Sequence, residues 1–223
     1  MNLTLNDKLS VIGLRLNLRN AKKLNRKELI SIDIEGTLIE AAREVPNDSK
    51  LFSLLCSWIL VHGDYAIVEK LFKKTKLLDA KDPAKNWIMA LAVFAKTQGF
   101  HNWGRWVKKL REPLYAFDRE LTLSAIRRKG AIKDFERYGI FVPEGSLRVR
   151  RDDALTPKEL AHDNQQYRNR LLYGASWRAD IVTAIEQGAA NPFVISKSLG
   201  CSYEPAHRIF REYQIANPTE DVA

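Results

Sequence analysis

Apolar residues recur every three or four positions along most of the chain, which is the spacing of one face of an α-helix. Between residues 25 and 111 the apolar positions with this spacing include Leu29, Ile32, Leu38, Ile39, Leu51, Leu54, Leu55, Trp58 and Ile59. Asp48 or Ser49 is suited to cap a helix that reaches His62, and Gly63 is suited to end it. The pattern therefore predicts a helical N-terminal region.

Two similar helical hairpins are predicted within this region. An apolar helix ending at Gly63 is followed by a second helix over residues 65–76. An apolar helix over 87–98 ends at Gly99 and is followed by a basic amphipathic helix over 102–111. Because two copies are too few for a stable repeat array, we expect a helical domain with hairpin symmetry rather than a solenoid.

The middle of the chain carries the clearest strand signal. A helix with a basic end is predicted over 118–129, followed by a β-hairpin with strands at 140–142 and 147–150 and a turn at 143–146. Such a hairpin is either a wing that lies on a DNA backbone or a plain surface hairpin. The polar segment 151–155 then predicts a domain boundary.

Three further helices are predicted after that boundary. Thr156 and Pro157 form a strong helix start, and we expect that helix to continue to about Tyr173. The next helix covers 177–187, and the last two are separated by a tight turn at Gly200. The fold class predicted is mainly α, with a hairpin-repeat-like helical domain at 1–112, a basic helix plus one small β-hairpin at 113–155, and a three-helix head at 156–223.

The last two helices have the spacing of a helix-turn-helix. Counting from Pro192 as the first position, the fifth residue must be small because the helices cross there, and Ser196 fills it. The ninth must be glycine because the turn needs a positive φ, and Gly200 fills it. The apolar positions of the shared core are filled by Ile195, Leu199, Cys201, Ala206 and Ile209.

On these residues, the segment from Ile195 to Tyr213 resembles the helix-turn-helix superfamily of DNA-binding proteins. The preceding Arg170, Gly174 and Arg178 are similar to the lead-in of small winged-helix bacterial regulators. Serine at the fifth position departs from the usual alanine. Too few residues follow Tyr213 for a C-terminal wing, so the resemblance implies a three-helix head without one.

The resemblance also implies which residues contact DNA. The second helix of such a motif lies in the major groove, where Arg208 and Arg211 suit guanine or phosphate, and Glu204 suits the amino group of cytosine. Ser202 and Tyr203 suit phosphates near the helix N-terminus. The full set of candidate DNA-binding residues is Ser202, Tyr203, His207, Arg208, Arg211, Arg178, Lys197, Arg148, Arg150, Arg151, Arg127, Arg128 and Lys129.

The charge of the chain supports a polyanionic partner, although unevenly. The 223 residues hold 36 Lys and Arg against 27 Asp and Glu, a net charge of +9. Residues 1–100 and 101–159 each carry +5, whereas 160–223 carry −1. Basic clusters occur at 22–27, 105–111, 127–129 and 148–151. Each is either a strip that contacts phosphates or an ordinary solvated helix face. We therefore expect the basic middle to assist the C-terminal head.

Other chemistry has little support in the sequence. Two cysteines and four unpaired histidines predict neither a disulfide framework nor a metal site, and no motif predicts a cofactor. A nuclease site at Asp79, Asp152 and Asp153 is a weaker interpretation than one in which these carboxylates lie in solvated loops. Trp87, Phe100, Trp103 and Trp106 suit a hydrophobic core better than base stacking. We expect no secretory signal, no membrane span and a cytoplasmic location.

The sequence thus predicts a cytoplasmic, non-enzymatic protein that binds double-stranded DNA, with a role in transcriptional regulation. A homodimer formed through the N-terminal helices would suit paired half-sites. The alternative is a helical adaptor of a larger nucleic-acid-handling complex, in which the C-terminal head docks on protein. A nucleic-acid enzyme is a third, weaker possibility.

Overall fold

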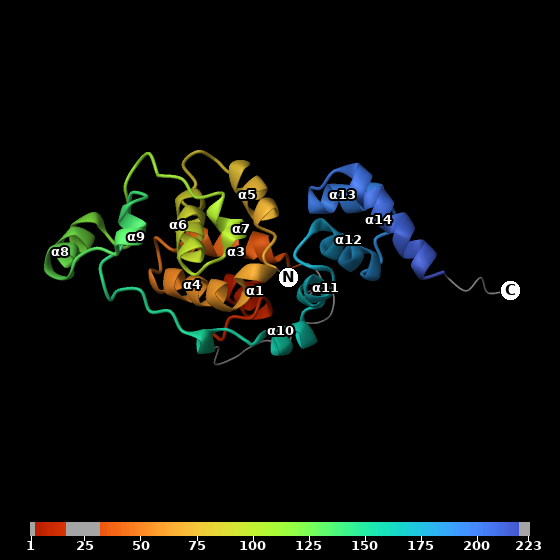
Figure 1. The fold of residues 1–223 in the computed structure, drawn as a ribbon, viewed down its shortest axis with the longest axis horizontal. Coiled ribbons are helices and arrows are strands. Elements are labelled where there is room, and N and C mark those ends of the chain that lie inside the picture. Colours follow the sequence, from red (N-terminus) through yellow and green to blue (C-terminus); the bar gives the residue numbers. More distant parts are fainter. Residues whose placement is uncertain (1–2, 17–31, 219–223) are drawn as a thin grey trace. The chain divides into compact units, whose positions relative to one another are not determined.

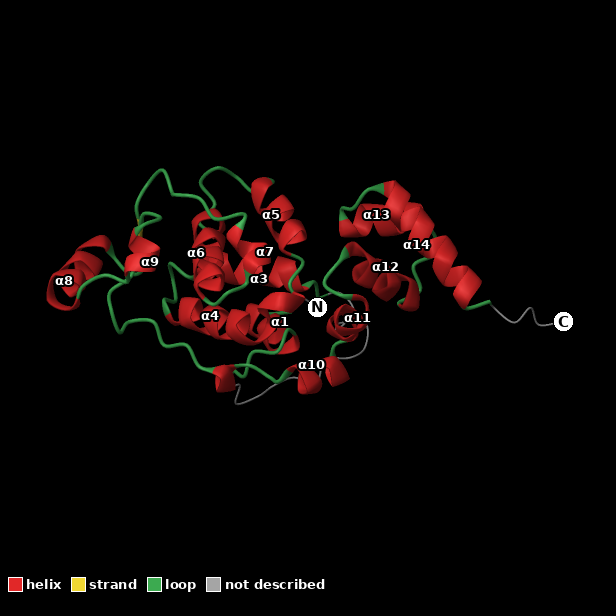
Figure 2. Ribbon diagram, viewed as in Figure 1, coloured by secondary structure: helices red, strands yellow, loops and turns green. Residues whose placement is uncertain are grey.

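The computed structural model describes residues 3–16 and 32–218. Contacts divide the chain into two compact units, Met1–Lys158 and Glu159–Ala223, which are described separately below. Helices and loops make up almost all of the described chain (Figure 2). The expectation of a mainly α fold is confirmed. The segment 113–155, expected to be a part of its own, belongs to the first unit.

The first unit is a cluster of helices around α6, with α8 standing apart (Figure 1). Its helices are α1 (Leu5–Val11), α3 (Ile34–Glu44), α4 (Lys50–His62), α5 (Val68–Lys76), α6 (Ala84–Thr97), α7 (His101–Gly104), α8 (Arg119–Lys129) and α9 (Lys133–Glu136). Short 3-10 turns lie at η1 (Gly63–Tyr65) and η2 (Arg151–Asp153). The division between the units falls within α10 (Pro157–Asp163).

The core of the first unit contains Trp58, Trp87 and Trp103, whereas Trp106 is only partly buried. Trp87 and Trp103 are buried, which confirms the core interpretation for these two. The indole of Trp103 donates to the carbonyl of Gly63 at 2.9 Å, and that of Trp58 donates to the carbonyl of Ile12 at 2.7 Å. These two indole N–H groups therefore have the partners that burial requires, whereas the buried Nε1 of Trp106 has none among the described residues.

The two predicted hairpins are not equivalent. The helix expected over 102–111 is wrong, because α7 ends at Gly104. Beyond it the backbone bonds to other elements: the N–H of Lys108 lies 3.4 Å from the sulfur of Met89, and that of Leu110 donates to the carbonyl of Tyr138 at 2.9 Å. These contacts replace the helical hydrogen bonds that periodicity alone would predict.

The predicted β-hairpin is also wrong. Strand β2 (Ile140–Phe141) pairs in parallel with β1 (Leu114–Tyr115), a partner from before α8. Residues 147–150 form no strand. Instead the backbone N–H groups of Arg148 and Arg150 donate to the hydroxyls of Ser53 and Ser57 on α4, at 3.2 and 3.0 Å. Arg148, Arg150 and Arg151 therefore do not form a wing.

The beginning and end of the first unit pair with each other. Leu14 forms an antiparallel bridge with Ala154. The N–H of Arg15 donates to Asp153 at 2.8 Å, and that of Leu155 donates to Gly13 at 2.7 Å. This pairing closes the unit and gives the segment after α1 its backbone hydrogen bonds.

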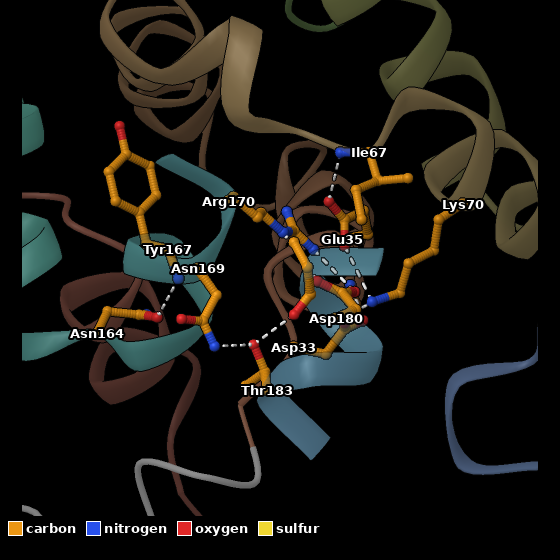
Figure 3. Close-up of polar contacts among 12 residues, drawn as sticks. Asp33, Glu35, Ile67, Lys70, Asn164, Tyr167, Asn169, Arg170, Asp180 and Thr183 are labelled. Carbon is orange, nitrogen blue, oxygen red and sulfur yellow. Dashed lines mark hydrogen bonds and ion pairs between the residues drawn. The ribbon is translucent and has the colours of Figure 1, made fainter. Parts of the chain in front are cut away.

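Charged side chains, of which Glu35 and Lys70 are buried, join α3 to α5 (Figure 3). Asp33 caps α3 by accepting from the N–H of Gly36 at 2.8 Å, and its carboxylate pairs with Lys70 and Lys74. Lys70 also lies 3.2 Å from Glu35, which accepts from the N–H of Ile67 at 2.9 Å. Burial raises the pKa of Asp33, but the charges and hydrogen bonds of the two lysines outweigh this and hold it well below its usual value.

The second unit contains α11 (Gln165–Tyr173), α12 (Trp177–Glu186), α13 (Pro192–Leu199) and α14 (Tyr203–Ala216). The single helix expected from Pro157 to Tyr173 is wrong, since α10 ends at Asp163. Asn164 starts α11 as a new N-cap by accepting from the N–H of Tyr167 at 2.9 Å. An asparagine within a helical pattern can interrupt it in this way because its side chain competes for backbone N–H groups.

No helix among the described residues is long and apolar enough to cross a membrane.

The buried His62 generates a prediction about acid stability. Burial lowers the pKa of its imidazole from 6.5 to about 4, against the opposing effect of a hydrogen bond with the backbone of Leu155. Because the unfolded chain takes up the proton first, the free energy of unfolding falls as pH drops from about 6.5 to about 4, by up to about 3 kcal/mol. Above that window the contribution is fully present.

Chemical denaturation followed by tryptophan fluorescence at pH values across this window measures the effect. The variant His62→Gln should lose most of the pH dependence, whereas His101→Gln, at an exposed position, should keep it. Equal pH dependence in wild type and His62→Gln would refute the assignment.

Candidate nucleic-acid interface

The three C-terminal helices share one apolar core. Ile181 and Val182 of α12 meet Ile195 of α13 and Ala206 and Ile209 of α14, all buried. Leu199, Cys201, Phe210 and Tyr213 pack against this cluster from its edge. The apolar positions expected from the spacing of the motif thus lie in this core or at its edge.

The turn between α13 and α14 depends on Gly200. Its φ of 70° and ψ of 26° lie in the left-handed region, which glycine adopts without steric cost. The N–H groups of Gly200 and Cys201 both donate to the carbonyl of Ser196, at 2.9 and 3.2 Å. The chain can therefore leave α13 and enter α14 within a few residues.

Ser196 fits where the two helices cross. It is 7% exposed, and its hydroxyl donates to the carbonyl of Phe193 one turn earlier at 2.9 Å. This bond satisfies the hydroxyl within α13 itself. Serine therefore replaces the more usual alanine here without leaving a buried polar group unpaired.

The exposed face of α14 carries four of the candidate residues, and a fifth precedes the helix. Ser202 is the N-cap, and Tyr203, His207, Arg208 and Arg211 are all exposed. The rings of Tyr203 and His207 lie 5.7 Å apart. The guanidinium of Arg208 is 3.9 Å from Glu204, a loose and largely exposed ion pair. The opposite face is the one that enters the core, so these side chains are available to a ligand.

The other two candidates of the second unit are engaged within it. Arg178 of α12 donates to Glu212 of α14 at 2.6 Å, and both side chains are half exposed. The ammonium of Lys197 lies 5.6 Å from the ring centre of Phe193. A shallow hollow of about 450 Å³ is lined by Phe193, Ser196, Lys197, Cys201 and Tyr203.

The remaining candidates belong to the first unit. Arg127, Arg128 and Lys129 form the basic last turn of α8, and all three are exposed. Arg148 and Arg150 lie along α4, as described above. Arg151 begins η2 and lines a hollow with Arg15 and Val61. The basic cluster at residues 22–27 lies outside the described residues.

Two features of the second unit were missed by sequence reasoning. Phe193 and Val194, in the first turn of α13, are 60% and 47% exposed. Both residues follow the N-cap Asn191, and they lie before Ser196, where α13 and α14 cross. The second feature is a buried pair in which Arg170 donates to Asp180 at 3.0 and 3.1 Å (Figure 3). No local spacing signals such a contact between α11 and α12.

The left-handed conformation of Gly200 generates a test of the turn. A Cβ at this position would meet no atom of the described part of the chain within 4 Å, so we expect a substitution to act through the backbone. We expect Gly200→Ala to lower the free energy of unfolding by about 1–2 kcal/mol, and Gly200→Asn by less, because asparagine tolerates this region. Denaturant titration measures both, and equal losses would show that the turn does not keep this conformation.

The buried pair generates a second test. Removing one partner of a buried ion pair costs about 3–5 kcal/mol, so Arg170→Met should sharply lower the thermal midpoint. Arg170→Lys keeps the charge but not the two-pronged geometry, and we expect an intermediate loss. Arg168→Met, at an exposed position of the same helix, is the matched control. Equal effects at positions 168 and 170 would contradict a stabilising role for the pair.

Comparison with models of known protein families, with curated proteins and with solved structures finds no match. The resemblance of the second unit to a helix-turn-helix therefore stays a prediction from its sequence.

Proposed function

We propose that the protein binds double-stranded DNA through the exposed face of α14. The observation that carries this proposal is the turn at Gly200, which joins two helices on a shared core and leaves one helix face outward. Helices presented in this way are of a size to enter the major groove. The side chains on this face include hydroxyl, imidazole and guanidinium groups.

Each side chain on the face has a matching role. Arg208 and Arg211, one turn apart on α14, suit the paired acceptors of guanine or the phosphates beside the groove. Ser202 and Tyr203, at the start of the helix, suit phosphate oxygens, where the helix dipole also favours negative charge. His207 lies between these groups on the helix surface. Glu204 suits the amino group of cytosine.

Charge limits how much of the binding the second unit supplies by itself. Residues 160–223 carry a net charge of −1, and phosphate neutralisation provides most non-specific affinity. The exposed basic turn at 127–129 and the arginines at 148–151 offer further positive charge in the first unit. A transcriptional regulator could obtain its sequence preference from base contacts of α14 and the rest of its affinity from phosphate contacts elsewhere.

A second candidate function is supported by the apolar surface beside this face. Phe193, Val194 and Tyr203 are each about half exposed, and they lie where α13 and α14 begin. Apolar residues exposed together are typical of protein docking surfaces. In this alternative the head is the docking module of an adaptor in a nucleic-acid-handling complex.

Fluorescence anisotropy of a labelled duplex from the region upstream of the gene, with a scrambled duplex beside it, tests the proposal. We expect Arg208→Ala and Arg211→Ala each to raise Kd about tenfold, because a good base contact contributes about 1–3 kcal/mol. Arg168→Ala removes the same charge from an exposed position on α11 and should have a much smaller effect. The affinity should fall steeply with salt.

The outcomes separate the two functions. Salt-sensitive binding that both α14 variants weaken, with preference for the upstream duplex, supports a DNA-reading head. Equal effects from all three arginine variants would refute base reading by α14. No duplex binding at low salt would overturn the proposal and leave the docking alternative. The variant Phe193→Ser would then test that alternative, because it should lose a partner protein that co-purifies with the wild type.

A further inference from the structure

A pocket of about 470 Å³ lies in the first unit, beside the N-terminal half of α4. This volume is within the range of pockets that hold small organic ligands. Its basic lining residues are Lys50, Arg148 and Arg150. The rest of the lining is apolar or carries hydroxyls, apart from the carboxylate of Asp153. The pocket thus combines positive charge with an apolar wall.

The three cations at this pocket are not neutralised by the fold. Within residues 3–16 and 32–218, none of Lys50, Arg148 and Arg150 forms an ion pair with a carboxylate. The carboxylate of Asp153 accepts from the hydroxyl of Ser57 at 3.0 Å. Like charges placed around one hollow raise the local potential and favour an anion there.

The backbone, not the side chains, fixes the arginines here. Ser53 and Ser57 are four residues apart on α4, a rise of about 6 Å. Arg148 and Arg150 are two residues apart in an extended segment, which spans about 6.6 Å. The two N–H groups therefore match the two hydroxyls that accept them, at 3.2 and 3.0 Å. Both guanidinium groups remain available to a ligand.

An apolar wall adjoins this charge. Phe117 is 39% exposed, although phenylalanine is among the residue types most often buried in proteins. It lines the pocket together with Leu54 and Leu147, which are partly buried. An exposed ring beside guanidinium groups suits a flat aromatic group attached to phosphate, because the ring offers a stacking surface and the arginines bind phosphate oxygens in a two-pronged way.

We propose that this pocket binds a free mononucleotide, with its phosphates on Lys50, Arg148 and Arg150 and its base against Phe117. The site is distinct from the face of α14 and does not depend on DNA binding there. The same chemistry occurs at the end of a single-stranded nucleic acid, so the test includes both sources.

Isothermal titration calorimetry of the full chain with ATP tests the proposal. Tripolyphosphate serves as the anion without a base, and adenosine as the base without phosphate. We expect ATP to bind with one site per chain and more tightly than either fragment. The variant Arg148→Gln/Arg150→Gln should raise Kd for ATP about a hundredfold, since each of the two lost charge-assisted hydrogen bonds contributes about a factor of ten or more.

Matched variants distinguish a built site from general attraction. Arg151→Gln removes the neighbouring arginine, which lines a different hollow, and should leave ATP binding nearly unchanged. Phe117→Ala should weaken ATP but not tripolyphosphate. Circular dichroism melting checks that each variant folds. The variants keep the backbone N–H bonds of positions 148 and 150, and both side chains are exposed.

Three results would overturn the proposal. The first is equal weakening by Arg151→Gln and by the double variant, which would mean attraction to basic surface in general. The second is equal affinity for ATP and tripolyphosphate, which would remove the base from the assignment. The third is a short oligothymidylate that binds through the same residues far more tightly than ATP, which would assign the pocket to nucleic acid. Arg208→Ala, which tests the α14 face, should not alter ATP binding.

Discussion

The first unit depends on the hydrogen bonds that the polar side chains of α4 make with distant backbone. Trp58 donates to Ile12 near the start of the unit, and Ser57 receives the N–H of Arg150 near its end. His62 bonds to the backbone of Leu155. Buried polar groups need such partners, so one helix fixes where both ends of the unit lie. The pairing of residues 13–15 with 153–155 follows from that placement.

The second unit is held together by fewer contacts than the first. Its core is small, and the direction in which α14 leaves α13 is set by the conformation of one glycine, Gly200. The buried pair of Arg170 and Asp180 joins α11 to α12 on another side of α12. Packing on one face of α14 and exposure on the other together create the surface proposed to meet DNA.

Local signals in the sequence were sufficient for much of this fold. The cap at Asn191, the glycine at 200 and the helix end at Gly63 were predicted because each depends on near neighbours. The β-hairpin and the helix over 102–111 were wrong because their outcome depends on distant partners. Residues 140–141 pair with a strand from before α8, and the Lys108 N–H contacts Met89. Likewise, nothing local places Arg148 and Arg150 beside Phe117.

The segment that contains Arg148 and Arg150 is attached to α4 by its backbone. Its attachment to the fold is therefore separate from the side chains that it presents to a ligand. Ser53 and Ser57 hold peptide N–H groups, which every residue except proline supplies. The identity of the side chains at 148 and 150 is therefore independent of the attachment. Ligand preference at this pocket can change by single substitutions without loss of the scaffold, which makes it a suitable position for redesigning specificity and a region where divergent copies of the chain could acquire new ligands.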